Sequence, residues 1–474
     1  MARLLDDFAR AVADHPDRVA IVDGSGHSVS FAQLQSRADD FARAWAARGI
    51  KSGDRVLLAM RLDADLYAAL AALWNLGATV VLPEPAMGIA GLRHAARVAD
   101  ASAFCSSGLY GLLKFILPEL WSLPHLRPRD RSGQPLPDAD ASDDDIALIS
   151  FTSGTSGAPK AIPRSHRFLS AQHNAIAPLL QSDAPERDLV AFPVFVLINI
   201  AGGRTSILPN WKMSRLAQLS PVQMGRWMAD QSVTRALLPP SLCEKLADAS
   251  APASLHAVFT GGGPVFPNVL DRMWSAHPRL QIHCVYGSTE AEPIAHFDAN
   301  TLSPEDRAAM TAGQGLLVGR PVDDIDLRID GDEVQVAGPH VNEGYLDPRH
   351  DAENKINDGT KIWHRTGDAG TIDEDGRLWL LGRTGTEMEI EGRRTFPFSI
   401  ETAVRLWPGV RQCALMERQG SACLVIEGDA EHLSDWRKAA ADLGIARVEH
   451  AKIPMDRRHA SKVDRAALKT SLGL

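Results

Sequence analysis

The chain has 474 residues, and 50 Lys and Arg against 59 Asp and Glu give a formal net charge of −9. Hydrophobic residues make up 45% and charged residues 23%, which excludes a disordered or fibrous chain and predicts two to four folding units. The mild acidity excludes a global positive field that would attract nucleic acid or anionic lipid. We therefore expect no nucleic-acid partner. No apolar stretch reaches the roughly 18 residues of a membrane span, so we also expect no stable membrane insertion.

The N-terminal residues and the cysteines both bear on where the protein resides. Asp6 and Asp7 stand where a signal peptide would carry basic residues before an apolar run. The five cysteines are scattered and form no Cys-x-x-Cys pair, which argues against a zinc site or a disulfide framework. This usage fits a reducing compartment, so we expect a cytoplasmic protein.

The first elements in chain order are a strand and an amphipathic helix. Val19–Val22 is a short apolar run that predicts a strand. Ser30 is expected to cap the helix that follows, with Gln33 as its capping-box partner, and Gly49 is expected to end it. The apolar residues of this helix recur at spacings of 3 and 4 and therefore share one face: Phe31, Leu34, Ala38, Phe41 and Trp45.

Strand and helix patterns continue to alternate. Val56–Met60 predicts a strand, Leu66–Leu76 a helix and Val80–Leu82 another strand. Such alternation predicts an α/β fold in which parallel-rich sheets are covered by helices. Residues Arg127–Asp145 are rich in Pro, Asp and Ser and predict a surface connection.

The pattern changes near Arg383. Short strands are predicted at Cys413–Met416 and Ala422–Glu427, and one helix at Leu433–Leu443, before a basic tail. We therefore expect the last 90 residues or so to form a separate small α+β domain.

An apolar run ends in a loop of hydroxyls and glycines closed by a lysine, Ile149–Lys160. Small residues let backbone N–H groups approach an anion, hydroxyls can donate to it, and a lysine adds a point charge. These features predict a phosphate cradle, although a flexible Ser/Gly turn has the same composition; the Walker ending is absent. The residues concerned are Thr152, Ser153, Gly154, Thr155, Ser156, Gly157 and Lys160.

This segment resembles the phosphate-loop signature of the acyl and aryl adenylate-forming synthetases, the superfamily of acyl-CoA ligases, peptide-synthetase adenylation domains and luciferases. The resemblance covers essentially the whole chain, because further segments follow in the family's order. They are Val285–Glu290 (Tyr-Gly-Ser-Thr-Glu), Arg365–Asp368 (Thr-Gly-Asp), Gly382–Arg383 with Ile390–Arg394, and Ser461–Arg465.

The resemblance implies that ATP is attacked at its α-phosphate by a substrate carboxylate, with pyrophosphate leaving. Catalysis of this kind is mainly positioning and electrostatic stabilisation. Glu290 is the expected Mg²⁺ ligand, since a carboxylate beside phosphates requires a cation between them. The resemblance also implies that Lys160 and the loop hydroxyls bind the β- and γ-phosphates and that Thr289 binds the α-phosphate. Asp368 and Arg383 are expected at the ribose. The residues expected around the adenine side are Gly261, Gly262, Gly263, Tyr286, Gly287 and Ser288.

Lys462 carries the most consequential implied role. In the family this lysine bridges the substrate carboxylate and the α-phosphate; read alone, Lys462 is a solvated charge in a basic tail. The resemblance divides the chain into an adenylate-binding body, residues 1–383, and a mobile domain, residues 384–474, that carries it. Two departures lie near the hinge, where Gly385 replaces the usual Asp or Lys and Glu389 replaces a lysine.

The expected acid-binding segment also departs from the family. Phe195 is followed by Val196, where amino-acid-activating relatives have Asp, so an apolar acid, such as a fatty acid, is favoured over an α-amino acid. Glu292 either faces solvent or recognises a polar group of the acid. The residues expected to contact the acid are Phe195, Val196, Asn199, Gly202 and His166, of which His166 is equally compatible with a structural role.

Three functions remain open. In the first, the acyl group passes to a thiol, either CoA or the phosphopantetheine of an acyl carrier protein. In the second, a hydroxyl or an amine captures it; the short motifs are similar to those of olefin-pathway β-lactone synthetases, in which the β-hydroxyl of the acid displaces AMP. In the third, the chain only binds nucleotide. The presence of all the expected catalytic residues disfavours the third; the first expectation is the thiol ligase, with capture by a hydroxyl or an amine as the alternative.

Overall fold

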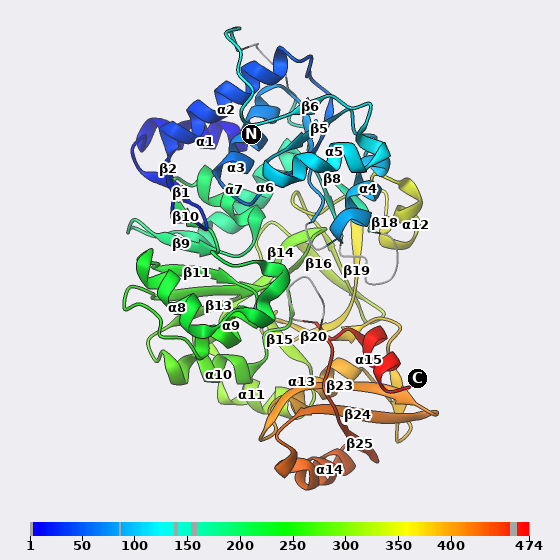
Figure 1. Ribbon diagram of the computed structural model, residues 1–474. Helices are drawn as coiled ribbons and strands as arrows, with labels where there is room; N and C mark the ends of the chain where they lie inside the picture. Colours follow the sequence, from blue (N-terminus) through cyan, green and yellow to red (C-terminus); the bar gives the residue numbers. More distant parts are fainter. Residues whose placement is uncertain (1–2, 85–86, 137–140, 153–158, 456–461, 474) are drawn as a thin grey trace.

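The computed structural model describes residues 3–84, 87–136, 141–152, 159–455 and 462–473. Two large sheets and their covering helices form the body, and a small domain lies at one end (Figure 1). The predicted α/β class and the predicted C-terminal α+β domain are both confirmed. Within the described residues, no helix is long and apolar enough to cross a membrane.

In the described part of the chain the first sheet has six strands, and all neighbouring pairs are parallel except β7 with β8. Its order is β6 (His125–Leu126), β5 (Ala103–Ser106), β3 (Arg55–Ala59), β4 (Thr79–Val81), β7 (Ile146–Phe151) and β8 (Ala161–Ser165). The hydroxyl-rich loop connects β7 to β8, so this sheet positions the predicted phosphate cradle.

The second sheet has fourteen strands among the described residues, with a parallel half and an antiparallel half. The parallel half contains β1 (Val19–Val22), β10 (Thr205–Ile207), β9 (Arg187–Val190), β11 (Arg235–Leu238), β12 (Ala257–Gly261) and β13 (Gln281–Ser288), with β2 (Ser28–Ser30) antiparallel at its edge. The antiparallel half contains β14 (Ala291–Asp298), β15 (Leu316–Pro321), β20 (Leu378–Arg383), β19 (Ile362–Ile372), β17 (Glu333–Ala337), β16 (Asp326–Asp330) and β18 (Lys355–Asn357).

The helices of the body cover these sheets. They are α1 (Leu4–Asp14), α2 (Phe31–Ala46), α3 (Ala64–Asn75), α4 (Gly88–Val98), α5 (Leu113–Ile116), α6 (His166–Ile176), α7 (Pro193–Ala201), α8 (Pro221–Asp230), α9 (Pro240–Ala247), α10 (Pro267–Ala276), α11 (Pro304–Thr311) and α12 (Asp351–Asn354). Five of them begin with proline, which has no N–H to leave unpaired in a first turn.

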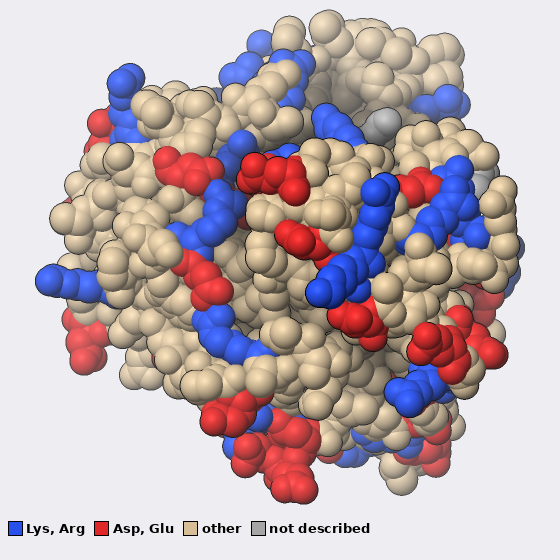
Figure 2. All heavy atoms as spheres, turned by 90° about the horizontal axis from the view of Figure 1, so that it is seen from below, with Lys and Arg blue, Asp and Glu red and all other residues tan. Residues whose placement is uncertain are grey.

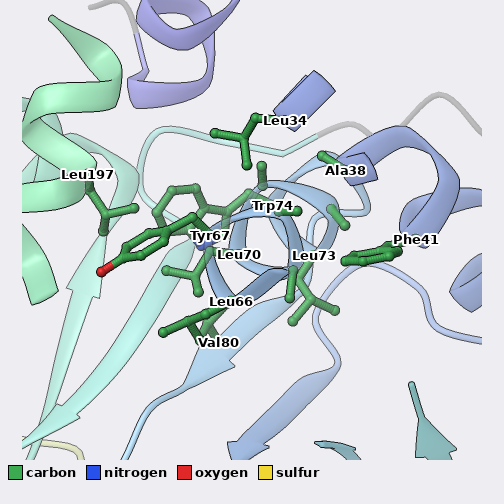
Figure 3. Close-up of a cluster of buried hydrophobic side chains, with 14 of the residues drawn as sticks. Leu34, Ala38, Phe41, Leu66, Tyr67, Leu70, Leu73, Trp74, Val80 and Leu197 are labelled. Carbon is green, nitrogen blue, oxygen red and sulfur yellow. The ribbon is translucent and has the colours of Figure 1, made fainter. Parts of the chain in front are cut away.

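Helix α2 forms where its cap and its apolar stripe predict it. The Ser30 hydroxyl accepts a hydrogen bond from the Gln33 N–H, and the Gln33 side chain accepts one from the Ser30 N–H. All five residues of the predicted stripe are buried. Figure 3 shows Leu34, Ala38 and Phe41 in the cluster that α2 forms with α3. The strands predicted at 56–60 and 80–82 each begin one residue earlier than expected.

The small domain has its own core. Strands β23 (Val410–Arg418), β24 (Ser421–Gly428) and β25 (Arg447–His450) form a sheet, covered by α13 (Pro397–Val404), α14 (Leu433–Asp442) and α15 (Arg465–Ser471), with the hairpin β21 (Met388–Ile390) and β22 (Arg393–Thr395) beside it. The predicted strands and helix of this region are confirmed. Trp436 and Leu424 lie fully buried inside the domain. Phe398 of α13 packs against Phe266 of the body, with ring centroids 5.7 Å apart.

Basic and acidic side chains are interspersed over the middle of the face shown in Figure 2. Inside the protein, Arg235 of β11 is enclosed with two acidic residues, Glu186 at 3.8 Å and Asp188. Arg235 of β11 donates to both carboxylate oxygens of Asp188 on β9, at 2.8 and 2.9 Å, and the two side chains are 3% and 0% exposed. The strand register places these residues opposite each other, so the pair joins two parallel strands of the second sheet.

Replacing Arg235 by Met should destabilise the body strongly. It leaves the Asp188 carboxylate buried without its partner, a change that costs about 3–5 kcal/mol in the free energy of unfolding. Denaturant titration followed by tryptophan fluorescence measures the loss. Arg272→Ala, which breaks the exposed pair with Asp248, is the matched control and should cost less than about 1 kcal/mol. Equal losses in the two variants would contradict the assigned role of the buried pair.

Candidate active site

Four motifs that are far apart in the sequence lie at or next to the ends of strands that the fold brings together. The β7–β8 connection carries Lys160, the β13–β14 connection carries Thr289 and Glu290, and β19 and β20 carry Asp368 and Arg383. The guanidinium of Arg164 donates to the Thr289 carbonyl at 2.6 Å, which ties the first motif to the second. The fold thus brings these predicted site residues to one region.

Asp368 lies between a tyrosine and an arginine. Its Oδ2 accepts a hydrogen bond from the Tyr286 hydroxyl at 2.7 Å, and its Oδ1 accepts one from Arg383 at 2.8 Å. Burial raises the pKa of Tyr286 well above its usual range, and Asp368 raises it further, so the tyrosine is a permanent donor. Burial opposes the charge on Arg383, but the neighbouring Asp368 carboxylate brings its pKa above the ordinary value.

Glu290 is held by a second tyrosine. The Tyr345 hydroxyl donates to Oε1 of Glu290 at 2.9 Å, and the Asn342 N–H donates to the Glu290 carbonyl at 2.7 Å. Burial would raise the pKa of Glu290, but His364, Tyr345 and Lys355 together bring it below the ordinary value. Together, these neighbours favour the ionised form of Glu290.

Two ammonium groups flank the ring of Tyr345. The Nζ atoms of Lys160 and Lys355 each lie 5.3 Å from its centroid, within the range of a cation–π contact. Lys160 also donates to the Asn354 side chain at 3.1 Å, and Lys355 donates to the Asn342 carbonyl. Positive charge is thus concentrated next to the Glu290 carboxylate.

This donor set fits Mg²⁺. The ion is usually held by one or two carboxylates together with substrate phosphates and water, not by a cage of protein ligands. An ionised Glu290 beside two lysines provides one such carboxylate and the cations that phosphates require. No cluster of three or more potential metal-ligating side chains occurs in the part of the chain that the structure describes.

Tyr345 and Lys355 were not predicted from the sequence. Lys355 begins a three-residue strand and belongs to no motif that the sequence analysis used. Tyr345 offered one weak signal, the rarity of tyrosine in the chain, which has four. Two of the four hold the two acidic residues of the site.

The structure describes some of the predicted phosphate-loop residues and the first of the adenine-side glycines. Thr152 and Lys160 bond to each other across the mouth of the loop, with both N–H donors 3.0 Å from their acceptors. Ser153, Gly154, Thr155, Ser156 and Gly157 lie outside the described residues. Gly261 ends β12, and a Cβ there would lie 2.4 Å from the Val285 carbonyl, so only glycine fits.

The remaining adenine-side residues lie beside these strands. Gly262 and Gly263 follow β12 directly, and Gly287 and Ser288 end β13. The Ser288 hydroxyl is buried and has no hydrogen-bond partner among the described residues.

Phe195 lines an apolar pocket; Val196, Asn199 and His166 are buried, and Gly202 is exposed. Val196 is fully buried, and Asn199 bonds to the side chains of Ser206 and Arg204. Gly202 gives space to the Arg204 guanidinium. His166 begins α6 and packs edge-on against Trp74 at 5.9 Å. Contact of any of these five with the acid stays a prediction.

The small domain carries the two residues that the resemblance made most prominent. Lys462 is exposed and lies two residues before Asp464, which caps α15. Gly385 follows β20 with φ at +78°, a conformation that glycine adopts without strain and other residues rarely do. The bridging role of Lys462 and the movement about Gly385 stay predictions.

Comparison with known proteins agrees with the motifs. The family model described as AMP-binding enzyme matches residues 8–346. The chain is 28% identical to an olefin β-lactone synthetase of Xanthomonas campestris pv. campestris, over 99% of this chain and 97% of that protein. It is 27% identical to a 2-succinylbenzoate–CoA ligase of Bacillus licheniformis, over 84% of each.

A solved structure is also similar over the whole chain. The amide bond synthetase McbA from Marinactinospora thermotolerans superposes with a TM-score of 0.81 at 25% identity, and the match covers 99% of both chains. The family match spans well over half of the chain and includes Lys160, Tyr286 and Glu290. The resemblance inferred from the motifs is therefore confirmed: the chain belongs to the AMP-binding enzyme family and is an adenylate-forming enzyme.

Proposed function

We propose that the protein activates a carboxylic acid as an acyl-adenylate, using ATP and Mg²⁺ and releasing pyrophosphate. The observation that carries the proposal is the chain of contacts among residues of separate motifs: Lys160 to Tyr345 to Glu290, and Tyr286 to Asp368 to Arg383. The first group of contacts places the ammonium of Lys160 near the ionised Glu290 carboxylate, and phosphates require cations of this kind. The other presents a carboxylate of the kind that accepts hydrogen bonds from ribose hydroxyls.

The proposed reaction is an in-line displacement. A carboxylate oxygen of the acid attacks the α-phosphorus, and the bond from that phosphorus to the pyrophosphate oxygen breaks. Lys160 and the loop hydroxyls hold the β- and γ-phosphates, Thr289 holds the α-phosphate, and Asp368 with Arg383 holds the ribose. Lys462 lies between the two anions that must meet, so its charge reduces their repulsion. Mg²⁺ held by Glu290 would neutralise charge on the phosphates.

For the second step we propose that a hydroxyl of the acid itself captures the acyl group. The hydroxyl oxygen attacks the acyl carbon, AMP leaves with the bonding electron pair, and the hydroxyl proton passes to solvent. The similarity to the β-lactone synthetase extends over 99% of this chain, and that to the CoA ligase over 84%. Similarity to an amide bond synthetase at 99% coverage likewise supports an acceptor other than a thiol.

Transfer to CoA or to a carrier-protein phosphopantetheine, which is the first expectation from the sequence, is the second candidate, supported by the relative that is a CoA ligase. Under either candidate we propose that the acid is apolar, such as a fatty acid, because Phe195 and its neighbours line an apolar pocket. The five cysteines are unpaired and buried, which supports the proposed cytoplasmic location.

Lys462→Ala should reduce acid-dependent ATP–pyrophosphate exchange at least about a hundredfold, since removing a group that stabilises charge in the transition state has effects of this size. The fold should be unchanged, because the Lys462 side chain is exposed. Lys469→Ala, a neighbouring exposed lysine on α15, is the matched control and should retain activity. Near-normal exchange in Lys462→Ala would refute the bridging role.

Tyr345→Phe tests how Glu290 is held. The change keeps the ring between the two lysines but removes the hydrogen bond to the carboxylate, an interaction worth about 1.5–3 kcal/mol. We expect a roughly 10- to 100-fold lower kcat/KM for ATP and a higher Mg²⁺ concentration at half-maximal rate. Tyr110→Phe, at an exposed tyrosine, should change neither quantity. An unaltered Mg²⁺ dependence in Tyr345→Phe would show that Glu290 does not act through the metal.

The mass of the product identifies the acceptor. We expect ATP, Mg²⁺ and a β-hydroxy acid to yield AMP, pyrophosphate and a product lighter than the acid by one water, without CoA. If the product forms only with CoA and has the mass of a thioester, the thiol candidate is correct and capture by the hydroxyl is wrong.

A further inference from the structure

One short stretch of the chain exposes much of its apolar surface. Ten large hydrophobic side chains are exposed among the described residues, and six of them lie between positions 109 and 121. Exposed apolar residues that occur singly need no explanation, but a contiguous group marks an interaction surface. We call this group the apolar patch; its members are Leu109, Tyr110, Leu112, Phe115, Ile116 and Trp121.

The patch lies on a helical segment at the surface of the first sheet. A 3-10 helix, Gly108–Leu112, runs directly into α5, and a second 3-10 helix, Pro118–Leu120, follows and packs against α4. Helices α4 and α5 lie beside each other in Figure 1. Leu117 and Leu120 are buried in a core that also contains side chains of α4. The inward side of the segment is therefore packed, and the patch residues point away from it.

The polar groups of the segment are paired within it. Lys114 is the only charged residue between positions 108 and 118. Its ammonium donates to three backbone carbonyls of residues 120–123. The Trp121 indole donates to the Phe115 carbonyl at 3.2 Å, which brings these two patch residues together. The patch therefore presents hydrocarbon and aromatic rings to solvent, without a lysine among them.

Arginines border the patch. The Arg61 guanidinium lies beside the first residue of the segment. At the other end, Arg93 and Arg97 of α4 lie 2.9 and 3.8 Å from the Glu119 carboxylate. All three arginines are exposed. Residues 87–136, which contain the patch, carry six Lys and Arg against three Asp and Glu, a net charge of +3 in a chain of −9.

We propose that the apolar patch and its bordering arginines bind the surface of a membrane that contains anionic phospholipids. The apolar side chains enter the headgroup region, where tryptophan, tyrosine and leucine are favoured. The guanidinium groups pair with lipid phosphates, and the local positive charge attracts the anionic surface. The contact is peripheral and reversible, since within the described residues no helix could span a membrane.

A second copy of the chain fits this surface less well. In a two-fold dimer the same patch meets itself, which brings the arginines of both copies to one interface. Like charges placed together in this way oppose association. An anionic bilayer complements the apolar side chains and the arginines at once. It also holds apolar acids in solution next to the enzyme, and this consequence alone rests on the proposed function.

Sedimentation with lipid vesicles tests the surface, without ATP or an acid. We expect the protein to bind vesicles of phosphatidylglycerol and phosphatidylcholine at least about tenfold more tightly than vesicles of phosphatidylcholine alone. Replacing Leu112 and Phe115 together by Ser should weaken this binding at least about tenfold, because their apolar area no longer leaves water. Both side chains are exposed, so the fold should be unchanged. Val222 and Ile372, two exposed apolar residues outside the patch, provide the matched double Ser control.

A second variant tests the charge. Replacing Arg61 and Arg97 together by Gln should weaken binding to the anionic vesicles at least about tenfold, since each basic group near such a surface contributes to attraction. Arg437 and Lys438, two exposed cations of α14 in the small domain, provide the matched double Gln control and should bind normally.

The outcomes decide between a membrane and a protein partner. Absence of binding to the anionic vesicles refutes the proposal, and so does unchanged binding in the variant of Leu112 and Phe115. If the vesicles bind nothing and light scattering shows a dimer that dissociates in that variant, the patch joins two copies and the membrane proposal is wrong. ATP–pyrophosphate exchange is measured separately, so a failure of vesicle binding leaves the proposed acid activation standing.

Discussion

Two tyrosine hydroxyls hold the two carboxylates of the site, and each of these bonds joins segments far apart in the sequence. Tyr286 on β13 donates to Asp368 on β19, and Tyr345 donates back to Glu290 after β13. The first bond joins the parallel half of the second sheet to its antiparallel half, and the second joins the end of β13 to the connection between β17 and β18. The positions of both acids depend on this arrangement.

The site also solves an electrostatic problem in a protein that is negative overall. Activating an acid with ATP requires two anions to approach, although the chain carries a formal charge of −9. The cations are local: Lys160 and Lys355 flank one tyrosine ring, and Arg383 lies on Asp368. Over a separation of a few ångströms in a partly buried site, such charges outweigh a dispersed net charge that solvent screens. Net charge therefore says little about the substrate.

Much of the fold was predictable because its signals are local. The capping box at Ser30 and the apolar stripe after it determine α2, and alternating strand and helix patterns identify the parallel sheets. The motifs identified Lys160, Glu290, Asp368 and Arg383, which the fold brings to one region. Tyr345 and Lys355 were missed because their importance arises from their proximity to Glu290 in the folded chain. Along the sequence, Tyr345 is 55 residues and Lys355 is 65 residues away from Glu290.

The predicted acid-binding residues are the part of the site that depends most on packing. Val196 and Asn199 are buried on α7, and which side of this helix faces a ligand depends on how the helix packs. Their contact with the acid therefore stays a prediction.

In the proposed reaction, the acid's carboxylate attacks the α-phosphorus of ATP. Supplying the acid with ¹⁸O in both carboxylate oxygens tests it directly, because the attacking oxygen stays with phosphorus when the acyl carbon is later released. The account predicts AMP that is heavier by one ¹⁸O, together with unlabelled pyrophosphate. AMP without label, or ADP with labelled phosphate, would contradict it.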